Sequence, residues 1–238
     1  MRTAYTVFRN LYNVRKMTMK LVLASGSQRR RELLTMCGYD YEIIVSNADE
    51  TIDENDPESF VRALSFRKAK EVFDRLFAAG RRDFAVIGSD TVVAFQKDGE
   101  TKPVIIGKPK DAEDAVRILS MLSGKTHRVF TGVSVIADIP DENAAAQCSI
   151  REKAEIQTEC SITEVTFETL SPDEITDYVN SGDPLDKAGS YGIQGPFGMF
   201  VREIRGNYFT VIGMPIPVLY KMLKKIGILP HGFYERIE

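Results

Sequence analysis

A single stretch near the start of the chain most constrains its fold. Residues 21–34 read Leu-Val-Leu-Ala-Ser-Gly-Ser-Gln-Arg-Arg-Arg-Glu-Leu-Leu, a short apolar run followed by a small-residue turn and a helical pattern. The run is typical of a buried strand, and Ser27 is a candidate N-cap because its hydroxyl can accept from an amide in the first helical turn. A strand leading through such a turn into a helix N-terminus presents unpaired N–H groups and a positive dipole end, so the stretch predicts an anion site.

The first turn of this helix carries three consecutive cations, Arg29, Arg30 and Arg31. Cations at a helix N-terminus oppose the helix dipole, so helix stability does not explain them, whereas a bound polyphosphate would. The alternative is a strand-to-helix corner with a solvated basic turn, and the spacing alone favours neither interpretation. The stretch has neither the Gly-Lys-Ser/Thr of a Walker A loop nor a dinucleotide Gly-x-Gly-x-x-Gly, so no general phosphate motif decides.

Composition excludes several classes of protein. With 238 residues, 43% hydrophobic and 27% charged, the chain is typical of a soluble globular protein of one large or two small domains. A net charge of −3 argues against duplex nucleic acid as a partner. Three cysteines without a C-x-x-C pattern and two histidines argue against a disulfide framework, a thiolate zinc site and a histidine-rich metal site. No apolar run approaches the roughly 20 residues of a membrane span.

Two charged residues stand where apolar neighbours predict burial. Lys68 falls in the middle of an apolar stripe on a helix predicted from Pro57 to about Ala79, so it must either snorkel to the edge of the stripe or meet an anion. Asp90 lies between the apolar runs 84–88 and 92–95, where a carboxylate needs pairing, hydrogen bonds or a metal. We place Asp90 at the end of a central strand, where ligands gather in open α/β sheets; the alternative is a carboxylate that caps a turn.

Two loops carry further polar groups. Residues 47–56 are rich in carboxylates, most of them expected on the solvated surface, with one or two near the start of the loop able to reach a cation. Residues 181–200 contain five glycines, which predicts a loop whose backbone closely approaches something, and Gln194 within it can donate to and accept from a planar heteroaromatic edge. Strands are expected at 41–45 and 161–170, and a hairpin at 201–204 and 208–211.

Four segments in this order match one family. They are Leu-Ala-Ser-Gly-Ser-x-Arg-Arg-x-Glu-Leu-Leu, Gly-Ser-Asp-Thr-Val-Val, Gly-Lys-Pro with the Asp-Ala-Glu-Asp-Ala helix that follows, and Gly-Asp-Pro-Leu-Asp-Lys-Ala-Gly-Ser-Tyr-Gly-Ile-Gln-Gly. The chain therefore resembles the Maf-like nucleoside triphosphate pyrophosphatases over roughly residues 20–229. The resemblance implies an α/β fold of the Maf and inosine triphosphatase-like kind, with an elongated mixed β-sheet flanked by helices and two lobes around a central cleft.

The resemblance also implies an activity: hydrolysis of the α–β phosphoanhydride bond of a nucleoside triphosphate, giving the monophosphate and pyrophosphate. A divalent cation, Mg²⁺ or else Mn²⁺ or another, would be held by Glu50 and Asp90, and Asp90 would also act as general base. The residues alone do not select Glu50 over Asp49.

By the same resemblance, Ser25, Arg29 and Arg30 form the phosphate-binding corner, and Lys68 and Lys108 are triphosphate ligands. The combination of Ser-Asp-Thr with Gly-Ile-Gln-Gly is similar to the branch of the family that acts on dTTP and UTP. Gln194, with Thr91 and Arg29 beside it, would select the base, and modified pyrimidine nucleotides fit the same logic.

Three alternatives remain open for the function: a pyrophosphatase for 7-methyl-GTP, one for an inosine-type triphosphate, and a nucleotide-binding regulator of cell division whose hydrolysis is incidental. The expected organisation is a basic extension at 1–19, a pyrophosphatase domain at 20–229 and a tail at 230–238. The polar stretch 139–158 is expected to be a long hairpin connection without assigned chemistry. We expect a homodimer in the cytoplasm, with an organelle as the alternative because the extension weakly resembles a presequence.

Overall fold

The computed structural model describes residues 19–96, 99–139 and 154–231. All of the predicted extension except Met19, the middle of the predicted connection and most of the predicted tail therefore lie outside the described residues. Within the described ranges, no helix has both the length and the apolar character needed to span a membrane.

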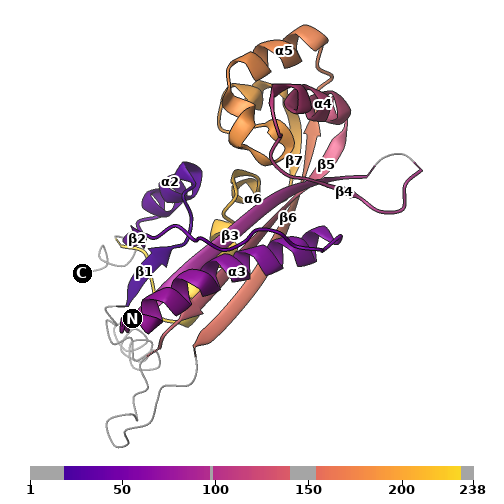
Figure 1. Ribbon diagram of the computed structural model, residues 1–238. Coiled ribbons are helices and arrows are strands. Elements are labelled where there is room, and N and C mark those ends of the chain that lie inside the picture. The colour runs from indigo at the N-terminus through magenta and orange to yellow at the C-terminus, as the bar shows by residue number, and fades with distance from the viewer. Residues whose placement is uncertain (1–18, 97–98, 140–153, 232–238) are drawn as a thin grey trace, which may run out of the picture.

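A seven-stranded mixed sheet forms the centre of the molecule, in the order β2-β1-β3-β5-β6-β7 with β4 paired to β3. Figure 1 shows two lobes joined by the long strands. The strands are β1 (Lys20–Leu23), β2 (Tyr41–Ile43), β3 (Phe84–Phe95), β4 (Val104–Ile106), β5 (Thr126–Ala137), β6 (Glu155–Phe167) and β7 (Val201–Arg205). The α-helices are α2 (Gln28–Met36), α3 (Pro57–Ala78), α4 (Ala112–Leu122), α5 (Pro172–Asn180), α6 (Tyr208–Ile212) and α7 (Ile216–Lys225). The elongated mixed α/β sheet flanked by helices is the predicted fold class.

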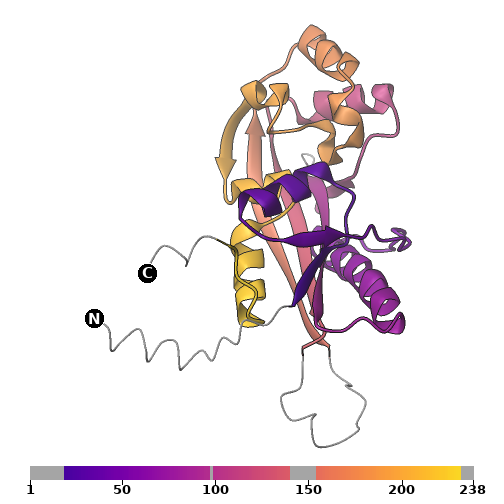
Figure 2. The ribbon, with the colours of Figure 1, turned by 90° about the vertical axis from the view of Figure 1, so that its left-hand side faces the viewer.

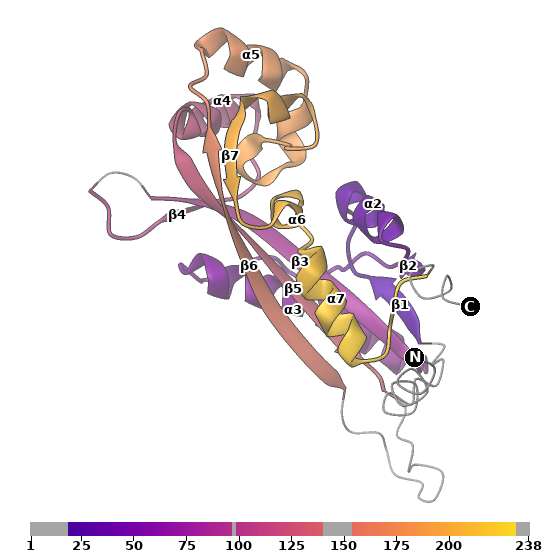
Figure 3. The same ribbon diagram turned by 180° about the vertical axis from the view of Figure 1, so that it is seen from behind.

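Helices cover both faces of the sheet in the lower lobe. The apolar stripe of α3 packs Val72 and Phe73 against Val22 and Val86 on one face. Figures 2 and 3 show α2 and α7 on the other face. Their leucines and Met222 pack there against alternate residues of the same strands. The upper lobe has its own core, in which α4 and α5 pack on the far ends of β3, β5 and β6. The cleft described below lies between these two packed regions.

Two glycines bring α3 very close to the sheet. A Cβ at Gly88 on β3 would overlap the carbonyl oxygen of Ser65, and one at Gly132 on β5 would overlap that of Val61. Only glycine permits this approach of helix backbone to strand backbone. The close packing places the middle of α3, including Lys68, over the middle of β3.

Three predicted elements are wrong in detail. Residues 208–211 form the helix α6 rather than a strand: Asn207 accepts from Phe209 N as its cap (2.9 Å), and Gly213 ends it with a φ of +112°. The β-branched and aromatic residues of this segment favour a strand, but the caps and tertiary packing override that preference. Strand β6 starts at Glu155, six residues before the predicted Ser161, because it pairs along the whole of β5. The predicted connection is therefore shorter.

The third correction concerns the start of α2. Ser27 occupies the N-cap position as predicted, but its hydroxyl makes no capping hydrogen bond. Instead the Ser27 amide donates to the hydroxyl of Ser25 (3.2 Å). The sequence pattern locates the helix start correctly and assigns the serine contact to the wrong residue of the turn.

Candidate active site

Asp90 lies in the middle of a continuous strand, not at a strand end as predicted. Strand β3 runs through Asp90, pairing with β1 along residues 84–87 and with β4 along 93–95 on the same edge. Between these two pairings none of the described strands pairs with this edge of β3, and Asp90 falls in that interval. The two apolar runs of the sequence are one strand, and the polar residues between them mark the place where its neighbour changes.

The charged residues that sequence analysis selected separately meet over this interval. The Lys68 ammonium on α3 lies 2.7 Å from Asp90 Oδ1 and 3.0 Å from Glu50 Oε1. The side chains of Lys68 and Asp90 are each 12% exposed, whereas that of Glu50 is 66% exposed. Lys68 thus meets anions rather than snorkelling out of its stripe, and it balances two carboxylates in a partly buried place.

The structure distinguishes Glu50 from Asp49, which the residues alone do not. Asp49 accepts from the Thr51 amide (2.9 Å), and this hydrogen bond lowers the pKa of Asp49. Its carboxylate therefore stabilises the local turn. Glu50 is the residue whose carboxylate reaches Lys68 and the cleft.

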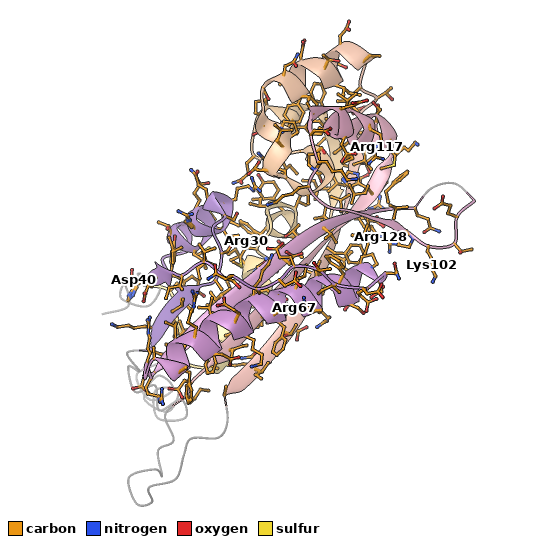
Figure 4. All side chains as sticks on the ribbon, viewed as in Figure 1. Arg30, Asp40, Arg67, Lys102, Arg117 and Arg128 are labelled. Atoms are coloured by element: carbon orange, nitrogen blue, oxygen red, sulfur yellow. The ribbon has the colours of Figure 1, made fainter. Side chains whose placement is uncertain are left out.

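Arg30 links three segments around the site. Its guanidinium donates to the carbonyl of Gly213 (2.8 Å), to the hydroxyl of Ser25 (3.1 Å) and to that of Thr91 (3.3 Å). Burial lowers the pKa of Arg30, and the charge of Asp90 opposes that shift. Figure 4 shows Arg30 between α2 and β3, where this fork fixes the corner between β1 and α2 against the strand that carries Asp90.

Arg29 points to the opposite side of the cleft. It pairs with Asp186 (3.2 Å), whose carboxylate also accepts from Lys187 (2.7 Å). Lys187 in addition donates to Asp183 at 3.0 Å. Burial disfavours the charged form of Asp186, but Lys187 and Arg29 outweigh it and lower the pKa of that carboxyl. The sequence gives no signal for this contact, because Asp186 and Arg29 lie 157 positions apart.

The glycine-rich loop forms the other wall of the cleft with residues 183–195, which include the short 3₁₀ turns η2 (Asp183–Asp186) and η3 (Ala188–Ser190); a third turn, η4 (Pro196–Phe200), follows. Tyr178 on α5 holds this loop, because its hydroxyl donates to Asp183 and accepts from the Gly192 amide (3.1 Å). Gln194 follows two residues later and is exposed.

All nine predicted site residues line one cleft of about 1790 Å³ between the lobes. The polar residues already described are joined there by Lys108, which is exposed, and by Thr91, whose hydroxyl also pairs with Thr131 (3.0 Å). Lys102 lines the same cleft and was not predicted, because it stands in a short polar stretch without a periodic pattern. Among the described residues no group of three or more Asp, Glu, His or Cys is placed to hold a metal ion.

Comparison with known proteins finds two relatives that share one name, and one solved structure. A protein of Agathobacter rectalis named dTTP/UTP pyrophosphatase is 41% identical over 217 residues, covering 88% of this chain and 98% of the relative. A protein of the same name from Bacillus thuringiensis subsp. konkukian is 42% identical over 210 residues, covering 88% and 96%. The solved structure of the Staphylococcus aureus Ham1 protein aligns with a TM-score of 0.46 and 16% identity, covering 87% of this chain and 98% of that one.

The family assignment rests on a match to a family model and on the identity to the two pyrophosphatases. Residues 20–226 match the sequence model of the family described as "Maf-like protein". This range contains every residue placed in the cleft above, together with the whole of the described sheet. By that match and by the identity to curated relatives, the chain belongs to the Maf-like protein family.

Proposed function

We propose that this protein is a pyrophosphatase that hydrolyses dTTP and UTP to the nucleoside monophosphate and pyrophosphate. The single observation that carries the proposal is the group formed by Lys68, Asp90 and Glu50 in a cleft whose adjacent corner holds Ser25 and Arg30. Polyanionic substrates require neutralisation and positioning more than covalent chemistry from the protein. The names of the relatives support the choice of dTTP and UTP.

The phosphate corner supplies donors of two kinds. The Ser25 hydroxyl accepts from the Ser27 amide and from Arg30, so its own hydrogen is free to be donated to a phosphate oxygen. The first amides of α2 have no intrahelical partner and form an anion site in the same place. Arg29 and Lys108 are the cations that would contact the triphosphate from the sides of the cleft.

Asp90 is the proposed general base. Its carboxylate is held by Lys68 on a strand fixed in the sheet, so it can accept the proton of an attacking water in a defined place. When a triphosphate enters, Lys68 can exchange a carboxylate contact for a phosphate contact without crossing the cleft. Gln194 on the opposite wall would donate to and accept from the pyrimidine edge, with Thr91 and Arg29 as further selectivity positions.

A divalent cation fits this donor set. Glu50 and Asp90 offer carboxylate oxygens near the same point, the ligand type that Mg²⁺ prefers, and Mg²⁺ binds with few protein ligands because substrate phosphates and water complete its shell. We therefore include Mg²⁺, or Mn²⁺ in its place, in the proposal, with Glu50 and Asp90 as its ligands. When bound, the cation would neutralise phosphate charge and lower the pKa of a bound water.

The family resemblance further suggests a homodimer in the cytoplasm. Light scattering on the purified full chain tests the dimer, and imaging of the tagged full chain tests the location. A monomer, or an organellar signal, would remove that part of the proposal and leave the chemistry untouched.

The test of function is pyrophosphate release with Mg²⁺ from a panel of dTTP, UTP, dCTP, ITP and 7-methyl-GTP, with Asp90→Asn beside the wild type. We expect release from dTTP and UTP, and a loss of about 10³-fold in the variant because the general base is removed. Release from a purine nucleotide alone would keep the chemistry and reject the pyrimidine assignment. Nucleotide binding without any release would favour the regulator of cell division instead.

A further inference from the structure

Glu50 stands on a segment that has no regular structure of its own. Residues 44–56, between β2 and α3, contain no helix or strand, and Glu50 lies at an exposed point of this segment. Asp90, its partner at Lys68, is fixed by the hydrogen bonds of β3 on the neighbouring strands. A carboxylate on an irregular segment needs external contacts to stay in register with one on a strand.

Arg67 supplies such contacts on both sides of Glu50. Its Nη1 atom donates to the carbonyl of Asp49 (2.8 Å) and to that of Thr51 (2.8 Å), the two residues that flank Glu50. A single guanidinium nitrogen thus ties to α3 the backbone turn from which the Glu50 side chain projects. Figure 4 shows Arg67 on α3, the same helix that carries Lys68.

Few other contacts restrain this part of the segment. Among the described residues, the hydrogen bonds and ion pairs that join residues 48–55 to another element come from Arg67, to the backbone, and from Lys68, to the Glu50 carboxylate. The start of the segment is held separately, by Arg75 donating to the carbonyl of Val45 (3.0 Å) and by the Asn47 amide donating to Glu71 (3.0 Å).

We infer that Arg67 is a positioning residue: it fixes the Glu50 backbone so that the two carboxylates of the cleft bind a divalent cation together. The inference rests on the proposed function, because it concerns the proposed cation ligand Glu50. Arg67 itself contacts neither substrate nor cation; it acts through the carbonyl groups of Asp49 and Thr51. Groups that orient ligands in this way typically change metal affinity by 10- to 100-fold when removed.

The sign of the effect separates positioning from simple charge. Arg67 is a cation near a proposed cation site, so by charge alone its removal would tighten the binding of a divalent ion. Positioning predicts the reverse, because a freed Glu50 samples orientations that do not bind. Arg75 provides a matched control: it is also an arginine of α3 bonded to a carbonyl of the same segment, but at Val45, five residues before Glu50.

The experiment measures binding of Mn²⁺ by its electron paramagnetic resonance signal, in the presence of the non-hydrolysable α,β-imido analogue of dUTP. Full-length Arg67→Met is compared with wild type and with Arg75→Met, and the thermal midpoint of each is recorded. We expect Arg67→Met to raise the Mn²⁺ dissociation constant about tenfold, and Arg75→Met to change it less than about twofold. Arg67→Gln, which can still donate to one carbonyl, should give an intermediate value and serves if Arg67→Met does not fold.

Two results would overturn the inference: Mn²⁺ binding by Arg67→Met as tight as, or tighter than, that of wild type, or an equal loss in Arg75→Met. Because the analogue is not turned over, the result does not depend on activity. A wild-type protein that binds Mn²⁺ with the expected ranking of variants but releases no pyrophosphate would disprove the proposed function and support the role of Arg67.

Discussion

The two walls of the cleft are built differently. The sheet wall, defined by Ser25, Arg30, Lys68 and Asp90, takes its side chains from β3, α3, α2 and the corner before α2, and each is held by a partner at 2.7–3.3 Å. The loop wall, residues 183–195, contains two short 3₁₀ turns and irregular backbone, and its proposed base-selecting residue, Gln194, is exposed. One wall is built largely on regular elements, whereas the other is built on irregular backbone.

This difference matches a division of work in the proposed reaction. Groups at the reacting phosphate must be placed within a fraction of an ångström, which a strand and packed helices can provide. Groups that select a base can tolerate adjustment, and loops on a rigid scaffold are where such residues vary. Substitutions in the sheet wall should therefore change turnover and stability together, whereas those in the loop wall should change KM and base choice.

The largest expected effect is on the free energy of unfolding, and it concerns the buried residues beneath the loop wall. Beneath it, His127 is buried, pairs through Nε2 with the Tyr191 hydroxyl (3.0 Å) and packs on Phe167, and burial lowers the pKa of His127 to about 3. In the unfolded state His127 binds a proton with a pKa near 6.5, whereas in the folded state it stays neutral until the pH approaches 3. Stability should fall as pH drops from 6.5 towards 3, by on the order of 4 kcal/mol.

Urea unfolding of wild type and His127→Phe between pH 7 and pH 4 measures this effect. Phenylalanine keeps the ring contacts and removes the titrating group, so the variant should lose the histidine component of the slope and retain that of the carboxylates. An equal dependence of unfolding free energy on pH in the two proteins would show that His127 does not cause the loss of stability at low pH.

The second prediction concerns Arg30, whose contacts hold the sheet wall together. Lysine at position 30 cannot reproduce the fork that joins Gly213, Ser25 and Thr91, so Arg30→Lys should lower kcat on the order of 100-fold. It should also lower the free energy of unfolding by about 1–3 kcal/mol, because buried acceptors lose their donor. Steady-state kinetics and thermal unfolding measure both.

Arg29→Lys is the matched control, since Arg29 stands in the same helical turn and has one ion-pair partner at the open side of the cleft. Its kcat and thermal midpoint should change far less. Equal losses of stability in the two variants would contradict the distinction between the walls.

Much of the sheet wall could be predicted from sequence because its residues violate local patterns. Lys68 interrupts an apolar stripe, Asp90 interrupts an apolar run, and the arginines oppose a helix dipole; each is a local conflict that needs an explanation. The position of Asp90 within β3 could not be read, because the interruption of pairing arises from β1 and β4, which lie elsewhere in the chain.

The loop wall was predictable only as a loop. Its glycines indicate irregular backbone, but the contacts of Tyr178 with Gly192, and of Asp186 with Arg29, depend on tertiary structure that no spacing encodes. The choice of Glu50 over Asp49 required either the family resemblance or the geometry of Lys68. The prediction of a strand at 208–211 was wrong because it used local preference alone, whereas the helix caps and tertiary packing decide this segment.

The third prediction sharpens the comparison at the loop wall. Gln194→Glu loses an amide donor and adds a negative charge facing the proposed substrate, so KM for dTTP and UTP should rise about tenfold while kcat stays within about threefold. The ratio of kcat/KM for dTTP to that for dCTP should fall. Gln28→Glu, which places the same charge at the edge of the cleft on α2, controls for charge and should leave that ratio unchanged. If Gln194→Glu lowers kcat instead, the loop wall takes part in turnover.

The smallest effect concerns the contact that joins the two walls. Arg29 pairs with Asp186, but Asp186 is 67% exposed, and exposed ion pairs contribute little to stability. Asp186→Asn should therefore leave the thermal midpoint nearly unchanged and lower KM about two- to threefold, because Arg29 no longer has a competing anion. The difference in KM between variant and wild type should shrink as the salt concentration rises, because salt screens the Arg29–Asp186 pair of the wild type. Kinetics at low and at high ionic strength measure this. A higher KM in the variant would mean that Asp186 orients Arg29 for the substrate, in which case the loop wall helps to build the phosphate corner.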